Sequence, residues 1–158
     1  MPPSGSPVKE AILDNLQNTA LPLLVAGSDY YTTVEKIQRI DAGPMELKMF
    51  PAIVIVPLST DYDREATQGT LTIAAAYRIQ LTLFLRTRTD AASKIERFIR
   101  DVHKAVLIDR YRNGNALNTR MTSDEVFYPT EDDEPYTTAN VILEVDYRTV
   151  WNDLNSPT

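Results

Sequence analysis

The fold of this chain is decided by the stretch YRIQLTLFLRT at residues 77–87, in which apolar and polar side chains alternate. The apolar positions share one face and are Tyr77, Ile79, Leu81, Leu83 and Leu85. The other face carries Arg78, Gln80, Thr82 and Arg86, interrupted by Phe84. A period of two residues is that of a β-strand with one buried side and one side in water. The sequence therefore predicts a long, half-buried strand.

A second alternating stretch, TANVILEVDYRTVW, occupies residues 138–151. Its apolar face consists of Val141, Leu143, Val145, Tyr147 and Trp151. Its other face carries Glu144, Asp146 and Arg148, with Ile142 and Val150 at the ends. Strands usually run about five or six residues, so both stretches are unusually long. We expect them to extend past a small core, and we expect another surface to cover the overhang.

Two amphipathic helices are predicted, and the longer one covers residues 90–107, with Asp90 as its N-cap. Its apolar stripe follows the three-and-four spacing of a helix and is formed by Ile95, Phe98, Ile99, Val102, Val106 and Leu107. Its polar side carries Lys94, Glu96, Arg97, Arg100, Asp101 and Lys104. The shorter helix covers residues 8–18, with Ser6 as its cap and Pro7 at its first position. Both helices should pack against a sheet.

Shorter segments complete the predicted sheet. An apolar run at residues 52–56, between two prolines, predicts a central strand buried on both faces. Residues 32–40 and 126–128 predict two further strands, and Asn113-Gly114 predicts a tight turn. The polar residues 59–72 predict a projecting hairpin or loop.

The order of these segments predicts an α+β fold. We expect a two-layer sandwich with one mostly antiparallel or mixed sheet of four to five strands and two helices on one face. A length of 158 residues suits a single domain over residues 1–158, with flexible ends at 1–6 and 153–158.

The composition excludes several classes of site. The chain has no cysteine, which removes disulfides and thiolate metal sites. Its formal net charge of −6 argues against tight nucleic-acid binding, which needs a basic surface. No apolar run approaches the roughly 18 residues of a membrane helix, and the first residues lack the pattern of a signal peptide. We therefore expect a protein without a membrane partner that is not exported.

Candidate chemistry is sparse. The acidic run Glu131, Asp132, Asp133 and Glu134 could bind a divalent metal, but a solvated loop between two prolines is the better interpretation. His103 is the only histidine, and we expect it at the edge of the helical stripe in a structural role. The sequence contains no nucleophile motif and no glycine-rich phosphate loop. We expect neither enzymatic activity nor a cofactor or metal.

Arginines form a loose band around the central strand and the long helix, at Arg78, Arg86, Arg88, Arg97, Arg100, Arg110 and Arg112. Acidic residues interrupt this band and aromatic residues are few, which favours a solvated or subunit-contacting surface over a nucleic-acid platform. Tyr147 and Trp151 could stack on a ligand, but packing against a helix or a neighbouring chain is the commoner role of such residues.

The chain resembles the tail terminator proteins of long-tailed bacteriophages, also called tail-completion or minor tail proteins. The matching features, over nearly the whole chain, are the helix at 8–18, PAIVIV at 51–56, YRIQLTLFLR at 77–86, the helix at 90–107 and VILEVDYRT at 141–149. The resemblance implies an α+β sandwich that forms a homohexameric ring, caps the tail tube, stops its polymerisation and joins it to the neck or connector.

The resemblance also implies partners and a location. The partners would be other copies of the chain, the tail tube protein, a neck or connector protein and, in a contractile tail, the sheath protein. DNA would pass through the ring without sequence-specific binding. The protein would be assembled in the host cytoplasm and reside at the head-proximal end of the virion tail.

Site residues follow as hypotheses from the strands and loops. We expect subunit-facing charges at Arg78, Arg86, Glu144, Asp146 and Arg148, although an ordinary solvated face is an equal alternative. We expect contacts with the tube or neck, or with the lumen of the ring, from Asp61, Asp63, Arg64, Glu65, Glu131, Asp132, Asp133 and Glu134. Two other functions stay open, namely a neck or head-completion protein that joins the portal and a small ligand-binding α+β domain.

Overall fold

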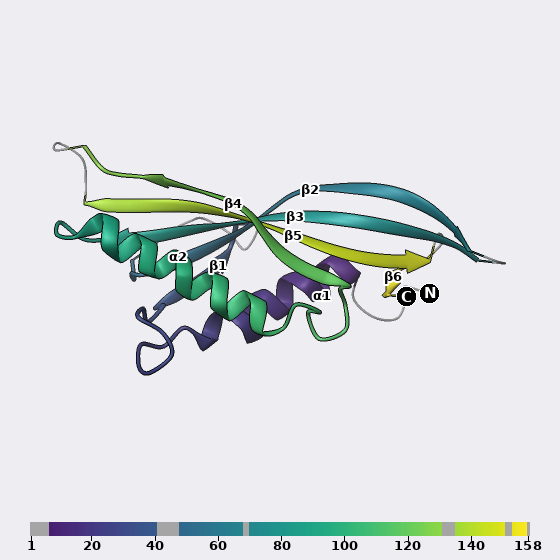
Figure 1. Ribbon diagram of the computed structural model, residues 1–158, viewed down its shortest axis with the longest axis horizontal. Helices are drawn as coiled ribbons and strands as arrows, with labels where there is room; N and C mark the ends of the chain where they lie inside the picture. Colours follow the sequence, from purple (N-terminus) through teal and green to yellow (C-terminus); the bar gives the residue numbers. More distant parts are fainter. Residues whose placement is uncertain (1–6, 41–47, 68–69, 131–134, 151–152, 158) are drawn as a thin grey trace.

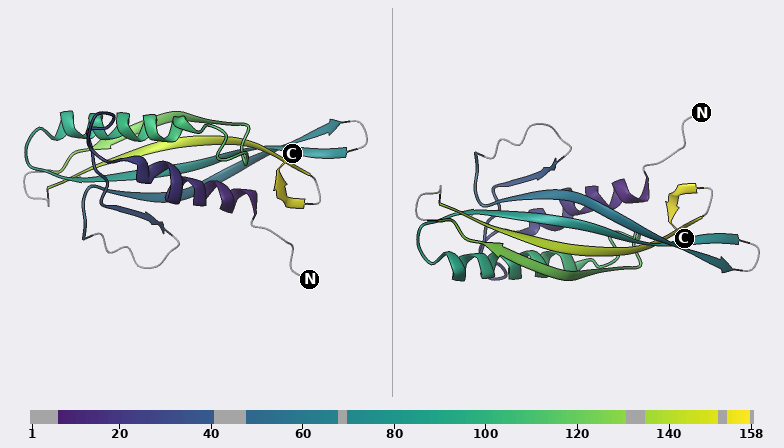
Figure 2. Two further views of the ribbon diagram at one scale, coloured as in Figure 1. Left: turned by 90° about the horizontal axis from the view of Figure 1, so that it is seen from below. Right: turned by 90° about the horizontal axis from the view of Figure 1, so that it is seen from above.

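A sheet of long strands runs along the molecule, and two helices lie against one of its faces (Figure 1). The computed structural model describes residues 7–40, 48–67, 70–130, 135–150 and 153–157, with the side chains of 64–67, 70–72, 150 and 153–157 left undescribed. The predicted α+β sandwich is confirmed, with both helices on the same face of the sheet (Figure 2).

The five main strands lie in the spatial order β1-β2-β3-β5-β4. Their bounds are Lys36–Arg39 for β1, Ala52–Thr67 for β2, Thr70–Arg86 for β3, Asn118–Phe127 for β4 and Tyr136–Val150 for β5. All neighbours are antiparallel except β1 and β2, which are parallel, so the sheet is mixed as predicted. A sixth strand, β6 at Asp153–Pro157, pairs with the end of β5, where the sequence predicted a flexible end.

Helix α2, at Ala91–Ile108, covers the sheet with the predicted apolar stripe. Its side chains at Ile95, Phe98, Ile99, Val102 and Val106 are buried, and Leu107 is half-buried. Each fully buried side chain of this size stabilises the fold by about 1.5–3 kcal/mol. Asp90 stands at the predicted N-cap position, but it adopts a left-handed conformation with φ 53° and its side chain caps no amide, so the predicted capping is wrong. Its backbone carbonyl instead accepts the amide of Lys94 at 2.9 Å.

Helix α1, at Val8–Asn15, continues as a π-helical turn at Leu16–Ala20 and a 3₁₀ turn at Leu21–Leu23. Pro7 stands just before the helix with φ −51° and ψ 145°, so it is the N-cap and not the first helical residue. Ser6, the predicted cap, lies outside the described residues. The apolar face of this helix joins the core, as the spacing predicted.

The alternation of β3 and β5 is confirmed as far as Thr149, and Trp151 lies outside the described residues. The apolar faces of both strands point toward the helices, with Ile79, Leu81, Leu83 and Leu143 fully buried. The opposite face bears no helix (Figure 2) and carries the polar positions of both strands. We call it the helix-free face.

Two strand boundaries were predicted wrongly. Strand β4 begins at Asn118, well before the predicted 126–128. The prediction missed this beginning because the first residues of β4 are polar and lie at the edge of the sheet, with one neighbouring strand. Strand β1 is shorter than the predicted 32–40, because the amides before it bond elsewhere. The backbone amide of Thr32 donates to the Asp101 side chain at 2.8 Å, and the backbone amide of Val34 donates to the Leu24 carbonyl at 3.0 Å.

The polar segment 59–72 is a hairpin, which was one of the two predicted possibilities. The short strand predicted at 52–56 is the start of the 16-residue strand β2, which pairs antiparallel with β3. A bulge between Pro57 and Thr60 adds one residue to β2, and beyond it Thr60 to Thr67 pair with Tyr77 to Thr70. We call residues 60–67 and 70–77 the arm. It is roughly 25 Å long by strand geometry and projects past the helices (Figure 1).

Candidate functional site

Three charged side chains on adjacent strands form a row across the helix-free face. Glu144 of β5 stands in register with Arg78 of β3 on one side and Arg120 of β4 on the other. Glu144 Oε1 accepts a hydrogen bond from Arg120, and its Oε2 lies 3.5 Å from Arg78 Nε. The hydrogen bond from Arg120 is the main reason why the pKa of Glu144 is lowered, although partial burial opposes it. The row therefore ties the three strands together within one copy of the chain.

Of the remaining predicted interface charges, Asp146 and Arg148 are two residues apart on β5, whereas Arg86 lies far from both. Asp146 is half-buried on the same face, and desolvation raises the pKa of its carboxyl group. Arg148 is opposite Ala74 in the arm, whereas Arg86 is opposite Tyr136 at the other end of β3, with its guanidinium 5.8 Å from the centre of that ring. The register separates the two arginines by roughly 40 Å of strand. They are two separate surface positions.

The predicted contact residues fall partly outside the described chain. Asp61 and Asp63 are exposed on β2 in the arm, and we call this pair the acidic strip. Asp61 Oδ2 lies 3.9 Å from Arg78 Nη2. The side chains of Arg64 and Glu65 are not described, and residues 131–134 lie outside the described residues.

The acidic strip borders a shallow groove of about 260 Å³. Asp61 and Asp63 stand opposite Ala76 and Ala74 of β3, which gives the groove a floor of small side chains. Asp146 and Arg148 line it on the β5 side, in register with the same alanines. Because the side chains at the centre of this groove are small, another chain could approach the backbone of β3 closely there.

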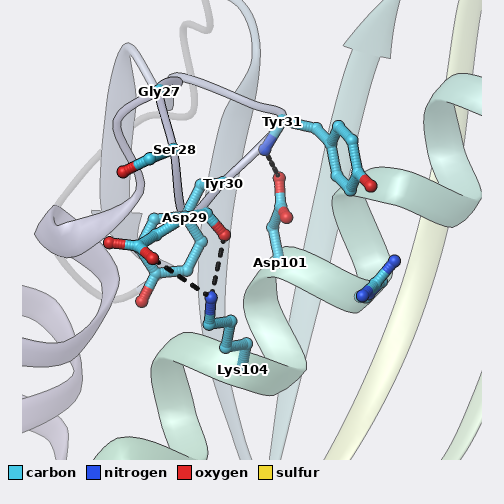
Figure 3. Close-up of a pocket in the computed structure, with 8 residues that line it drawn as sticks. Gly27, Ser28, Asp29, Tyr30, Tyr31, Asp101 and Lys104 are labelled. Atoms are coloured by element: carbon cyan, nitrogen blue, oxygen red, sulfur yellow. Dashed lines mark hydrogen bonds and ion pairs between the residues drawn. The ribbon is translucent and has the colours of Figure 1, made fainter.

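Helix α2 holds a buried anchoring residue that the sequence did not reveal. Asp101 was placed on the solvated side of the helix, but it is only 2% exposed. Its Oδ2 accepts hydrogen bonds from the backbone amides of Tyr31 at 2.9 Å and Thr32 at 2.8 Å (Figure 3). The carboxylate therefore anchors the loop before β1 to the helix. A helical period alone cannot reveal such a contact between residues so far apart in the chain.

Basic side chains of α2 surround this anchored loop. The guanidinium groups of Arg97 and Arg100 lie 5.2 and 5.7 Å from the centre of the Tyr31 ring. Lys104 Nζ donates to the Asp29 carbonyl at 3.0 Å and lies 3.7 Å from the Asp29 carboxylate (Figure 3). We call Arg97, Arg100 and Lys104, together with Tyr31, the basic patch.

A polar pocket of about 200 Å³ lies between residues 27–31 and the basic patch (Figure 3). Its charged groups Asp101 and Lys104 already have partners. Asp101 accepts hydrogen bonds from the backbone amides of Tyr31 and Thr32, and Lys104 donates to the carbonyl of Asp29. Within the described part of the chain, no three side chains are grouped so that they could ligate a metal. The arrangement is that of a loop docked on the helix.

An aromatic pocket of about 360 Å³ lies at the other end of the helix-free face, lined by Phe50, Phe84, Tyr136 and Thr138. The rings of Phe50 and Tyr136 are 5.1 Å apart between centroids and are tilted by 35°. Phe84, the one apolar residue on the polar face of its strand, thus belongs to an aromatic cluster.

Two residues of the predicted arginine and aromatic sets are buried. Arg112, placed in the basic band by its sequence, is 0% exposed and donates a hydrogen bond to the Val106 carbonyl near the end of α2. Burial lowers the pKa of its guanidinium. Tyr147 is 3% exposed, and burial raises the pKa of its phenol. His103 is exposed on α2, next to the buried Val102 in the sequence.

Lysine 9 of α1 connects that helix to the base of the arm. Lys9 Nζ lies 5.4 Å from the centre of the Tyr62 ring and 5.1 Å from that of Tyr77. A hydrogen bond with Lys9 is the main reason why the pKa of the Tyr62 phenol is lowered. These contacts set the position of the arm relative to the helical layer.

Comparison with other proteins adds no assignment to this geometry. Over the described residues, no helix is long and apolar enough to cross a membrane. The sequence matches no protein-family model and no curated protein.

Proposed function

We propose that this protein is a structural component of a bacteriophage tail, which assembles into a ring at the head-proximal end of the tail tube. The ring ends tube polymerisation and provides the joint to the neck, and DNA passes through its lumen. The proposal joins the resemblance of the sequence to the shape of the molecule. Such a function requires surfaces that bind other protein chains and does not require a catalytic site.

The observation that carries the proposal is the arm. Strands β2 and β3 run for 16 and 17 residues, and their hairpin projects past the helices that cover the rest of the sheet (Figure 1). Within the described residues, β3 pairs with β5 as far as Thr72, whereas the outer edge of β2 has no neighbouring strand along the arm. Unpaired backbone groups on such an edge can pair with another chain. In a ring, a neighbouring copy would cover this surface.

Native mass spectrometry and light scattering of the purified protein test the proposal. We expect a homohexamer, or a monomer that becomes hexameric on tubes of the tail tube protein encoded in the same genome. Added during tube polymerisation, the protein should give tubes that stop growing. A protein that stays monomeric in the presence of tubes would contradict the proposal.

Binding assays separate this function from the two alternatives. A neck protein would bind the connector and leave tube growth unchanged. A ligand-binding domain would stay monomeric and bind a small molecule in one of its pockets. In the polar pocket, Asp101 is already bonded to two backbone amides and Lys104 to Asp29, which argues against a ligand there.

A further inference from the structure

We infer that the acidic strip of one copy docks on the basic patch of the next copy, so that the arm lies across the outward face of helix α2. The inference rests on the proposed function, because it names the contact that would build the ring. It commits to one occupant, a second copy of this chain.

The basic patch is built to meet carboxylates. Arg97, Arg100 and Lys104 stand at intervals of three and four residues and are all exposed, so they form one outward row on α2. The Tyr31 ring lies beside both guanidinium groups, which restricts their motion. Within the described residues, Arg97 and Arg100 have no carboxylate partner in their own chain. This concentration of positive charge stands out in a chain of net charge −6.

The acidic strip has the matching spacing and charge. Asp61 and Asp63 are two residues apart on β2, so their side chains share one face at a separation of roughly 7 Å. Arginines three residues apart on a helix present their Cβ atoms at about 5–6 Å. Two arginine–aspartate pairs can therefore form at once.

The surroundings of the two surfaces also fit. The acidic strip borders the groove floored by Ala74 and Ala76, which lets a helix come close. On α2, Ile108 continues the basic row by one turn and is 62% exposed. Docking would place this apolar side chain toward the alanines of the groove, which adds burial of apolar surface to the ion pairs.

The two surfaces cannot meet within one copy. The arm projects at one end of the long axis, and α2 lies toward the other end (Figure 1). Moreover, the acidic strip lies on the helix-free face, whereas the arginines and the lysine of the basic patch are exposed on α2, on the helical side of the sheet. A contact between unlike surfaces of identical copies is heterologous and repeats from copy to copy, which closes into a ring or continues as a filament.

Charge reversal tests the contact. The variants R97E/R100E and D61K/D63K each place like charges on both sides of it, and each should weaken self-association by about 100-fold or more, whether alone or on tubes. The control K36E/K48E changes the net charge as much as R97E/R100E does, at exposed lysines away from α2, and should associate like the wild type. Circular dichroism and thermal unfolding establish that each variant is folded.

Mixing the two reversed variants is the decisive step. The arm of D61K/D63K carries lysines and can pair with the α2 helix of R97E/R100E, which carries glutamates. The arm of R97E/R100E and the α2 helix of D61K/D63K keep their native charges and can also pair. Native mass spectrometry should therefore show oligomers with the two variants in equal numbers, although neither associates alone. Added salt at about 1 M should dissociate the wild type, because exposed ion pairs are screened.

Other outcomes overturn the inference in distinguishable ways. If both reversed variants form the wild-type ring, the contact lies elsewhere and the ring proposal stands. If they lose association and mixing does not restore it, the two surfaces are not partners. If the wild type never associates, even on tubes, both proposals fail. Binding of a duplex DNA oligonucleotide by the wild type but not by R97E/R100E, with self-association unchanged, would assign the basic patch to nucleic acid.

Discussion

Glu144 accepts a hydrogen bond from Arg120 on the adjacent strand, and this pair forms one half of the charged row on the helix-free face. Arg78 completes the row from the other neighbouring strand, with its Nε 3.5 Å from Glu144 Oε2. A carboxylate only 8% exposed between two arginines stabilises strand pairing as well as presenting charge.

Protonation of Glu144 should lower stability at acidic pH. Its pKa is lower in the folded chain than its ordinary value of 4.5, so its contribution is complete above that pH and is lost as the pH falls through the folded pKa. E144Q should lower the free energy of unfolding by about 1–2 kcal/mol at pH 7 and by much less at pH 3. Urea denaturation at both pH values measures this. An equal loss at pH 3 would show that the charge is not responsible.

Asp146 should have the opposite effect. Desolvation raises the pKa of its carboxyl group, so ionisation destabilises the folded state as the pH rises through the shifted value. D146N should therefore be at least as stable as the wild type at pH 7 and show no gain at pH 3. The same denaturation series checks this, with E144Q as the contrasting variant on the same strand. A loss of stability at pH 7 would show that the carboxylate has a favourable partner.

Removal of the Asp101 side chain should release the loop before β1. D101A leaves the amides of Tyr31 and Thr32 without their acceptor and should cost about 1–3 kcal/mol. D101N keeps an oxygen acceptor and should cost less. Hydrogen exchange at these two amides should accelerate in D101A. The control E96Q changes an exposed carboxylate of the same helix and should leave both exchange rates as they are.

Arg86 and Arg148 should act independently, because the register places them at opposite ends of the sheet. We expect R86Q and R148Q each to change the free energy of unfolding by about 0.5 kcal/mol or less, and the double variant to show the sum. Under the proposed function, the double variant should lose the ring before it loses the fold. Native mass spectrometry during urea titration follows both events. Ring loss and unfolding at the same urea concentration would contradict this prediction.

Local patterns predicted the layers of the fold. Alternation in residues 77–87 and 138–149 identified which strand faces are buried, because a strand places successive side chains on opposite sides. The stripe of α2 was predicted in the same way. Strand β4 was largely missed, since an edge strand with polar side chains has no apolar period to detect.

The sequence by itself determined the sandwich, the faces of its long strands and the core stripe of the second helix, since these depend on spacings within one segment. The tertiary structure alone decided which charges meet. The bulge after Pro57 moves Asp61 and Asp63 to the helix-free face, and the fold buries Asp101 beneath a loop some 70 residues away in the chain. These placements arise from strand register and from contacts between distant segments, which leave no periodic signal in the sequence.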